Sequence, residues 1–308
     1  MMLPPGIWRI GTIHLRTGII LYLSEGCELA GTDDIAEFPP DPYQNKYDCS
    51  RRLIFGDSIT DAGIAGPGTL DGNGLAFRAY SAGSTTFDGV NLPQPRINLI
   101  RFQDCTNMIV RDAVLRDSPF WTLHMLRCRG VEVLHLAIIN EMPAPQWIPY
   151  ASNWNNTDGV NPDSSEDIII NDCAIVAGDD CVVIKNTAFN RQLAPSSRRI
   201  AMRRCLLATT CAAFKIGTET LGDEISEVLI EDCDVVCADR AVAVDCSDSA
   251  SVKRLTFQGF RVAACGQAVS LAVTKRISDQ PYMGQIRDLH FNDMHFPTGE
   301  IRIRDRAC

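Results

Sequence analysis

Short apolar segments with alternating polar positions recur along the chain and are separated by Gly, Asp, Asn and Ser residues. From residue 97 onward the segments are INLIRFQDC, VEVLHLAII, DIIINDCAIV, RIAMRRCLLA, EVLIEDCDVV, RLTFQGFRVA and DLHFNDMHFP. They have the length of strands, are rich in β-branched residues and lack the period of a helix. The pattern therefore predicts an all-β fold made of many short strands.

These segments also repeat at a roughly constant interval. Aligning them on the residue that ends the first strand of each unit matches Cys173, Cys205, Cys233 and Phe260, at intervals of 32, 28 and 27 residues. Intervals in this range are typical of stacked repeats. Strand-length units favour a parallel β-helix over leucine-rich or ankyrin repeats, with coils stacked about 4.8 Å apart. The spacing predicts one single-stranded solenoid domain over residues 1–308.

Cysteine is unusually frequent in the chain, with 13 residues, and none lies in a paired CxxC arrangement with zinc spacing. Cys105, Cys173, Cys205 and Cys233 each follow a short apolar strand. Because free cysteine is among the most buried residue types, we expect these four side chains to form one buried ladder of thiols rather than disulfides. A structural metal site is not expected, and the cysteine content leaves the cellular compartment open.

The composition excludes several classes of protein. With 45% hydrophobic and 22% charged residues, the chain of 308 residues has a globular composition. The net charge of −9 and the scattered basic residues argue against nucleic-acid binding. No apolar run approaches the roughly 18 residues of a membrane span, and the start, MMLPPGIWRIG, has neither the basic nor the apolar region of a signal peptide. No membrane partner is expected.

Three carboxylates stand out in the stretch from Asn156 to Lys185. Asp158 lies 21 residues before the pair Asp179 and Asp180, which is about one coil of a solenoid. We expect the three side chains to be neighbours on one face, where mutual repulsion raises at least one pKa and sets a proton donor beside a proton acceptor. Glycoside hydrolysis needs such a pair. Alternatively, these residues only form turns and are satisfied by calcium or solvent.

An insert just before Asp158 carries aromatic residues among prolines. Residues 140–156, NEMPAPQWIPYASNWNN, include Trp147, Tyr150 and Trp154. Aromatic rings beside acidic groups can stack on the apolar face of a sugar, and Trp154 is the candidate nearest to the acidic stretch. The alternative is that the rings pack under the loop and stabilise it.

The stretch NTDGVNPDSSEDIIINDC followed by GDDCVVIK resembles the signature of glycoside hydrolase family 28, the polygalacturonase and rhamnogalacturonase group. Similar segments cover nearly the whole chain, including GPGTLDGNG and KIGTETLGDEISEVLIEDC. The resemblance implies a right-handed parallel β-helix of the pectin-lyase-like kind and hydrolysis of α-linked pectic polysaccharide. Asp179 would be the general acid, and Asp158 and Asp180 would activate water for an inverting attack, with carboxylates roughly 6.5–9.5 Å apart.

The resemblance also implies a secreted or periplasmic protein, although no signal peptide is visible, and suggests that the helical N-terminal cap of the family is missing. We expect a monomer that acts on a carbohydrate polymer or oligosaccharide without a cofactor or metal.

Two family motifs are absent. The Gly-His-Gly that follows one coil after the paired aspartates is replaced by the stretch from Cys211 to Gly217, which contains no histidine. The Arg-Ile-Lys that holds a substrate carboxylate falls on or near Ala243, Val244 and Asp245. Loss of these cations weakens binding of a uronate, so rhamnogalacturonan or a decorated or neutral glycan becomes a competing substrate.

Other polar residues are candidates for substrate binding: Asn156, Lys185, Lys215, Glu219 and His124, with Arg240 as a further cation. Lys185 ends the GDDCVVIK motif, and His124 lies in the family-like segment FWTLHML. For Lys215, Glu219 and Arg240 a solvated surface charge is the alternative, and for His124 a structural histidine. Two other functions stay open: a β-helix polysaccharide lyase with a Lys or Arg base and usually calcium, and a glycan-binding or structural solenoid without activity.

Overall fold

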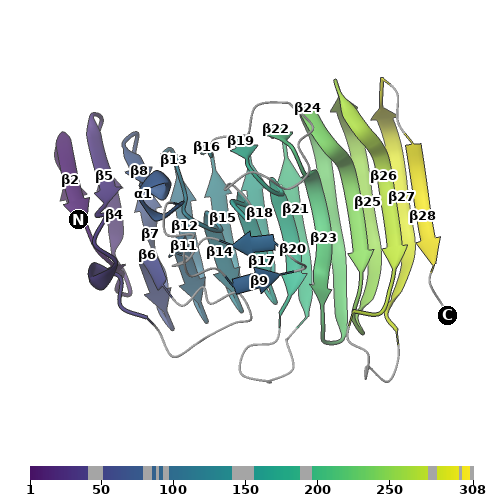
Figure 1. Cartoon of the computed structure of the whole chain (residues 1–308), viewed down its shortest axis with the longest axis horizontal. Helices are drawn as coiled ribbons and strands as arrows, with labels where there is room; N and C mark the ends of the chain where they lie inside the picture. The colour runs from purple at the N-terminus through teal and green to yellow at the C-terminus, as the bar shows by residue number, and fades with distance from the viewer. Residues whose placement is uncertain are drawn as a thin grey trace.

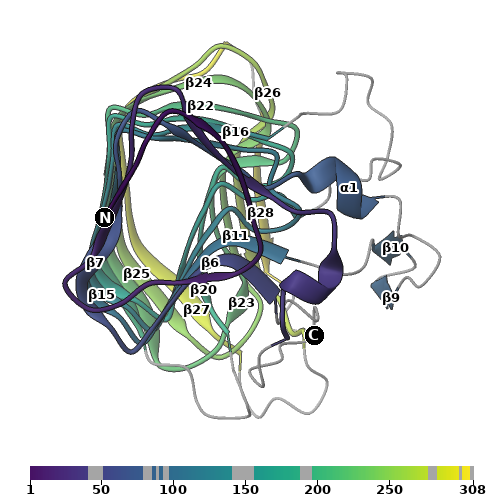
Figure 2. The same ribbon diagram turned by 90° about the vertical axis from the view of Figure 1, so that its left-hand side faces the viewer.

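The computed structural model describes residues 1–40, 51–78, 85–87, 90–92, 97–140, 156–187, 196–276, 283–297 and 300–305. Its strands wind around a common axis, as seen end-on in Figure 2, and each coil lies parallel to the next (Figure 1). The predicted fold is confirmed: the chain is a right-handed parallel β-helix. No helix among the described residues is long and apolar enough to span a membrane.

Three faces of stacked parallel strands make up the solenoid. The first face contains β3 (Ile13–His14), β6 (Arg51–Asp57), β11 (Ile97–Gln103), β14 (Leu123–Leu126), β17 (Val160–Asp163), β20 (Val182–Asn186), β23 (Ala212–Thr220), β26 (Cys265–Val273) and β28 (Glu300–Asp305). The second face contains β1 (Met2–Leu3), β4 (Ile20–Leu23), β7 (Thr60–Ala65), β12 (Thr106–Arg111), β15 (Arg129–Leu134), β18 (Glu166–Asn171), β21 (Ser197–Arg203), β25 (Ser251–Val262) and β27 (Gln285–His295).

The third face contains β2 (Gly6–Ile10), β5 (Cys27–Gly31), β8 (Thr69–Asp71), β13 (Val114–Arg116), β16 (Ala137–Ile139), β19 (Ala174–Ala177) and β22 (Leu206–Thr209). The long strand β24 (Glu224–Cys246) runs through all three faces and pairs with β21, β22 and β23 in turn. A 3₁₀ turn, η1 (Ile35–Glu37), a helix, α1 (Gly74–Arg78), and an antiparallel hairpin of β9 (Thr85–Phe87) and β10 (Val90–Leu92) complete the described elements.

The interior of the solenoid is filled by Ile, Val, Leu, Phe and Cys side chains stacked coil on coil. At the corner between the second and third faces, the stack contains Cys173, Cys205, Cys233 and Phe260, all at most 2% exposed. The register pairs Cys233 with Phe260, as the repeat alignment predicts. The eleven cysteines among the described residues are free thiols, so the predicted ladder of buried thiols exists.

Cys105 does not belong to that ladder, so the prediction that it stacks with Cys173, Cys205 and Cys233 was wrong. It lies at the corner between the first and second faces, after β11, where its thiol contacts Cys128. The residues before Cys105 and before Cys173, Asp104 and Asp172, both have a positive φ, of 52° and 56°. Because both corners use the same left-handed residue followed by a buried small side chain, the sequence pattern does not distinguish them.

Candidate active site

The three predicted carboxylates lie at the start of neighbouring strands in the middle of the first face (Figure 1). Val160 in β17 pairs with Val182 in β20, and the Gly159 N–H donates to the Asp180 carbonyl at 3.0 Å. Asp158 therefore lies beside Asp180 on the next coil. The spacing of about one coil between them does bring the acidic positions together, as expected.

Asp158 is almost fully buried, with 1% of its surface exposed. Its Oδ2 accepts a hydrogen bond from Asn161 Nδ2 at 2.7 Å and lies 3.7 Å from Lys185 Nζ. Its Oδ1 is buried without a hydrogen-bond partner among the described residues. Burial, followed by repulsion from Asp179, raises the pKa of Asp158 to about 8 despite the attraction of Lys185.

Asp180 is equally buried but has stronger cationic partners. Lys215 Nζ lies 2.8 Å from Asp180 Oδ2, and the Ala212 N–H donates to Oδ1 at 3.1 Å. Burial alone would raise the pKa of this carboxyl, but Lys215, Arg240 and Lys185 outweigh it and lower the pKa below its usual value. Asp158 and Asp180 are therefore driven in opposite directions: the first keeps its proton at neutral pH and the second is ionised.

Asp179 is the most accessible of the three carboxylates, being half-buried. Its Oδ2 accepts hydrogen bonds from Asn156 N at 2.9 Å and from Asn156 Nδ2 at 3.2 Å, and its Oδ1 accepts one from the Asp180 N–H. Asn156, a predicted site residue, thus orients the carboxylate that is most open to solvent.

Lys185 and Glu219, two further predicted residues, meet beside Asp158. Lys185 Nζ lies 3.5 Å from Glu219 Oε2 and 4.9 Å from the centre of the Trp121 ring. Lys215, also predicted, follows on the adjacent strand and binds Asp180. The structure therefore gathers Asn156, Lys185, Lys215 and Glu219 around the three carboxylates.

His124 lies on the same face but has a different environment. It is fully buried, and its Nε2 lies 3.0 Å from Asp163 Oδ2. Burial lowers the pKa of His124 to about 4, so the ring is neutral at ordinary pH. Asp163 also accepts from the backbone and hydroxyl of Thr187. This geometry favours the structural alternative for His124 over contact with a substrate. Trp147, Tyr150 and Trp154 lie outside the described residues.

Four polar residues of the site were not predicted: Asn161, Asp163, Asp248 and Arg276. Asn161 and Asp163 lie in β17, the strand that follows Asp158. They are two residues apart, so their side chains point to the same side of the strand, and this spacing could have predicted them. Arg276 donates to both oxygens of Asp248, at 3.1 and 2.7 Å, and lies 3.5 Å from Glu219. No motif in the sequence marks these last two residues.

The stretches expected to replace the two absent family motifs lie on the two coils that follow Asp180. Ala212 is on the coil after Asp180, and Ala243 pairs with Lys215. Asp245 accepts from Arg240 Nη1 at 3.1 Å, and Arg240 Nη2 donates to Cys211 Sγ at 3.6 Å. The candidate cation Arg240 is therefore compensated by Asp245.

Asp179, Asp180 and Cys211 offer ligand atoms within 4.8 Å of one another, which is a geometry that could hold a metal ion. Lys215 binds the same Asp180 carboxylate and its ammonium would oppose a cation there. The donor set of two carboxylates and a thiol, without histidine, matches neither a typical zinc nor a typical calcium site.

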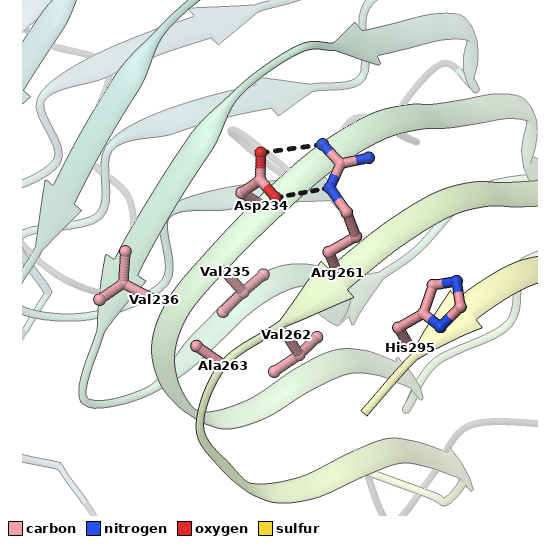
Figure 3. Close-up of a pocket in the computed structure, with 7 residues that line it drawn as sticks. All are labelled: Asp234, Val235, Val236, Arg261, Val262, Ala263 and His295. Carbon is pink, nitrogen blue, oxygen red and sulfur yellow. Dashed lines mark hydrogen bonds and ion pairs between the residues drawn. The ribbon is translucent and has the colours of Figure 1, made fainter. Parts of the chain in front are cut away.

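A separate surface pocket lies at the corner between the second and third faces, where β24, β25 and β27 meet (Figure 3). Its lining is mainly apolar, from Val235, Val236, Val262 and Ala263, and Arg261 binds both oxygens of Asp234 across it. It is on a different face from the carboxylates.

Comparison with known proteins identifies the class of this chain. Residues 29–263 match the model of the family described as glycosyl hydrolases family 28. This match covers more than half of the chain, so the protein belongs to glycosyl hydrolase family 28, and the predicted family is confirmed.

Among the relatives, a "Probable polygalacturonase" of Vitis vinifera is 28% identical over 256 residues, covering 79% of this chain and 49% of the relative. An "Endo-polygalacturonase" of Pectobacterium carotovorum subsp. carotovorum is 27% identical, covering 73% of this chain and 54% of the relative. The chain thus spans about half the length of these curated relatives.

Among solved structures, the family 28 exopolygalacturonase of Yersinia enterocolitica superposes with a TM-score of 0.73 at 16% identity, covering 99% of this chain and 62% of that chain. The endo-xylogalacturonan hydrolase from Aspergillus tubingensis gives a TM-score of 0.70 at 13% identity, covering 98% of this chain and 86% of that chain. At these identities the likeness establishes the fold.

Proposed function

We propose that this protein hydrolyses α-linked pectic polysaccharide or oligosaccharide, of the galacturonan or rhamnogalacturonan type. The observation that carries the proposal is the different surroundings of two neighbouring buried carboxylates: Asp158 Oδ2 lies 3.7 Å from Lys185 Nζ, whereas Asp180 Oδ2 lies 2.8 Å from Lys215 Nζ. Burial therefore raises the pKa of Asp158 to about 8, whereas Lys215 and other cations lower that of Asp180. At neutral pH the site therefore contains both a carboxylic acid and a carboxylate, which are the two groups that glycoside hydrolysis requires.

In this mechanism Asp179 is the general acid, because it is the carboxyl group most open to a glycosidic oxygen. Asp180, which Lys215 keeps ionised, is the base that activates the attacking water, and Asp158 helps to hold that water. Repulsion from Asp179 adds to the effect of burial in raising the pKa of Asp158.

The stereochemistry needs its own test. The family resemblance implies inversion, in which the carboxyl groups of the acid and the base lie roughly 6.5–9.5 Å apart. We propose inversion, with water held between Asp158 and Asp180. NMR of the first product decides: a β-anomer supports the proposal, and an α-anomer indicates retention.

The preferred substrate depends on whether the cations of the site are available to bind a uronate carboxylate. Lys185, Lys215, Arg240 and Arg276 each lie against a carboxylate of the protein, in the pairs with Glu219, Asp180, Asp245 and Asp248. A uronate carboxylate would have to compete with these pairs, and a charge-assisted hydrogen bond contributes about 1.5–3 kcal/mol. We therefore propose rhamnogalacturonan or decorated pectin in preference to plain homogalacturonan.

A polysaccharide lyase would need a neutral lysine or an arginine as base. Burial lowers the pKa of Lys185 and of Lys215, but Glu219 and Asp180 respectively outweigh this effect, so both pKa values are raised and both side chains stay protonated. This favours hydrolysis. Export of the protein and its monomeric state remain predictions.

The test is activity on a panel of pectic fragments, measured as new reducing ends together with ultraviolet absorbance. We expect hydrolysis without an unsaturated, absorbing product, and a loss on the order of 10²- to 10⁴-fold in kcat for Asp179→Asn.

The matched control is Asp172→Asn, which removes a carboxylate bound to Arg204 on the outer surface. It should retain wild-type activity. Full activity of Asp179→Asn would refute the assignment, an absorbing product would indicate a lyase, and an inactive wild type that still binds the fragments would indicate a glycan-binding solenoid.

A further inference from the structure

A row of alternating charges connects the carboxylates to a later coil of the solenoid. It begins at Asp158, continues through Lys185 and Glu219, and ends at Arg276 and Asp248. These five residues come from five separate segments of the chain, between positions 158 and 276. Only the first two lie in the stretch that resembles the family signature.

Glu219 occupies the centre of this row. It is 3% exposed, and its two oxygens face different cations: Oε2 lies 3.5 Å from Lys185 Nζ and Oε1 lies 3.5 Å from Arg276 Nη1. Lys185 Nζ in turn lies 3.7 Å from Asp158 Oδ2, so the ammonium is nearly equidistant from the two carboxylates. Neither distance is that of a short, direct hydrogen bond.

The far end of the row is held in place by the backbone. Arg276 donates to both oxygens of Asp248, and Asp248 Oδ2 also accepts from the Thr220 N–H at 2.8 Å. Thr220 directly follows Glu219 in β23. Arg276 and Asp248 therefore fix the position of Glu219 from two sides.

The other groups around Asp158 complete the electrostatic balance. Asp179 and Asp180, in the turn before β20, repel the negative charge of ionised Asp158. Lys185 in β20 and Lys215 in β23 attract that charge. Asn161, in β17, contributes a neutral hydrogen bond. Of these, Lys185 is the cation closest to the Asp158 carboxyl, so its position is decisive for the charge of Asp158.

We propose that Glu219, held by Arg276, is a positioning residue that draws Lys185 away from Asp158 and thereby keeps a proton on the carboxylate cluster of the resting enzyme. The proposal rests on the proposed hydrolase function and goes beyond it, because it assigns the retained proton to two residues outside the acidic motifs. Without Glu219, Lys185 would bind Asp158 directly, and Asp158 would lose the proton that it holds at neutral pH.

The sign of the effect follows from the charges. Removing the negative charge of Glu219 takes a repelling charge away from Asp158 and frees Lys185 to approach it, and both changes lower the pKa of Asp158. Removing the positive charge of Arg276 leaves Glu219 to attract Lys185 more strongly, and both of these changes raise that pKa. The two substitutions should therefore act in opposite directions.

The experiment measures the Asp158 titration directly, by ¹³C NMR of carboxyl-labelled protein without substrate, and the pH profile of kcat/KM on pectic fragments. For Glu219→Gln we expect the Asp158 midpoint and the alkaline limb of the profile to fall by on the order of one pH unit. For Arg276→Gln we expect a rise, and Glu219→Asp should restore part of the wild-type midpoint.

The matched control is Glu231→Gln, which breaks a glutamate–arginine pair with Arg203 on the second face. It should leave both midpoints unchanged. A fall of activity in Glu219→Gln with an unshifted profile and an unshifted NMR midpoint would overturn the proposal and leave Glu219 a packing role. If Glu219→Gln does not fold, an unchanged or lowered midpoint in Arg276→Gln overturns it as well.

The two readouts separate this proposal from the proposed function. An inactive wild type would refute the hydrolase, while the NMR midpoints of the variants would still support or overturn the role of Glu219 in holding the proton.

Discussion

Asp158, Asp179 and Asp180 have the same side chain but three different environments. Asp158 is buried beside one distant ammonium, Asp180 is bound tightly by Lys215, and Asp179 is half-exposed and held by Asn156. The sequence predicted these residues and several of their neighbours, because spacing by one coil places matching positions side by side. It could not predict which cation binds which carboxylate, since a difference of about 1 Å in side-chain position decides that.

At this scale we predict the effect of Lys215→Met. Lys215 keeps Asp180 ionised, so its loss should raise the pKa of Asp180 and move the acidic limb of the kcat/KM profile to higher pH. At pH 5 the loss in kcat should be on the order of 10²-fold, measured as reducing ends.

The control is Lys253→Met, in which a lysine bound to Glu224 is removed from β25, on another face. It should retain the wild-type profile. An acidic limb that does not move in Lys215→Met would contradict the role of Lys215.

At the scale of one coil, the residues at the corners between faces are the feature that the sequence predicts best. At the corner between the second and third faces, the alignment correctly matched Cys173, Cys205, Cys233 and Phe260. The expected ladder of thiols wrongly included Cys105, because its corner also begins with a left-handed residue, Asp104, and continues with a buried side chain. A left-handed residue followed by a buried side chain can form any of the corners of a coil. Which corner it forms depends on the lengths of the preceding strands, and those lengths vary from coil to coil.

Phe260 allows a test of this corner. It is fully buried and packs at the end of the row of thiols. Phe260→Ala should lower the free energy of unfolding by about 3–5 kcal/mol through lost burial and a cavity, measured by urea denaturation. Cys233→Ala, in the same row, removes much less volume and should cost clearly less. Equal losses in the two variants would argue against the packing described here.

On the scale of the whole molecule, the outer surface of the coils carries arginine–carboxylate pairs that cross from one coil to the next. Arg199 binds Glu166 and Asp167, and Arg261 binds Asp232 and Asp234. The sequence shows that these charges are numerous but not that they are paired, because the pairing partners are about 27 to 33 residues apart. The same distance in sequence explains why Arg276 and Asp248 were missed at the site.

These pairs predict how stability depends on pH. Hydrogen bonds from arginines lower the pKa values of Glu166, Asp167 and Asp234, so their contribution to stability is present above about pH 4 and lost as the pH falls below it. Asp158 has the opposite sign: its raised pKa means that stability falls as the pH rises from about 4 toward about 8.

We therefore expect the Tm, measured by circular dichroism, to be highest at mildly acidic pH and to fall on both sides. Asp158→Asn should flatten the decline on the alkaline side and leave the acidic side unchanged. A Tm that stays constant from pH 3 to pH 8 would contradict both parts of this prediction.

The parallel register of the first face has a consequence for how such a protein can diverge. Asp180, Ala212 and Arg240 occupy the same position on three successive coils, yet each is held by its own strand. In the proposed hydrolase, a substitution on the second or third of these coils would change what a bound sugar meets there without altering the strand that carries the proposed reacting groups. Catalysis and substrate recognition would then depend on different coils, so selection could change the preferred polysaccharide one coil at a time while the proposed catalytic residues persist.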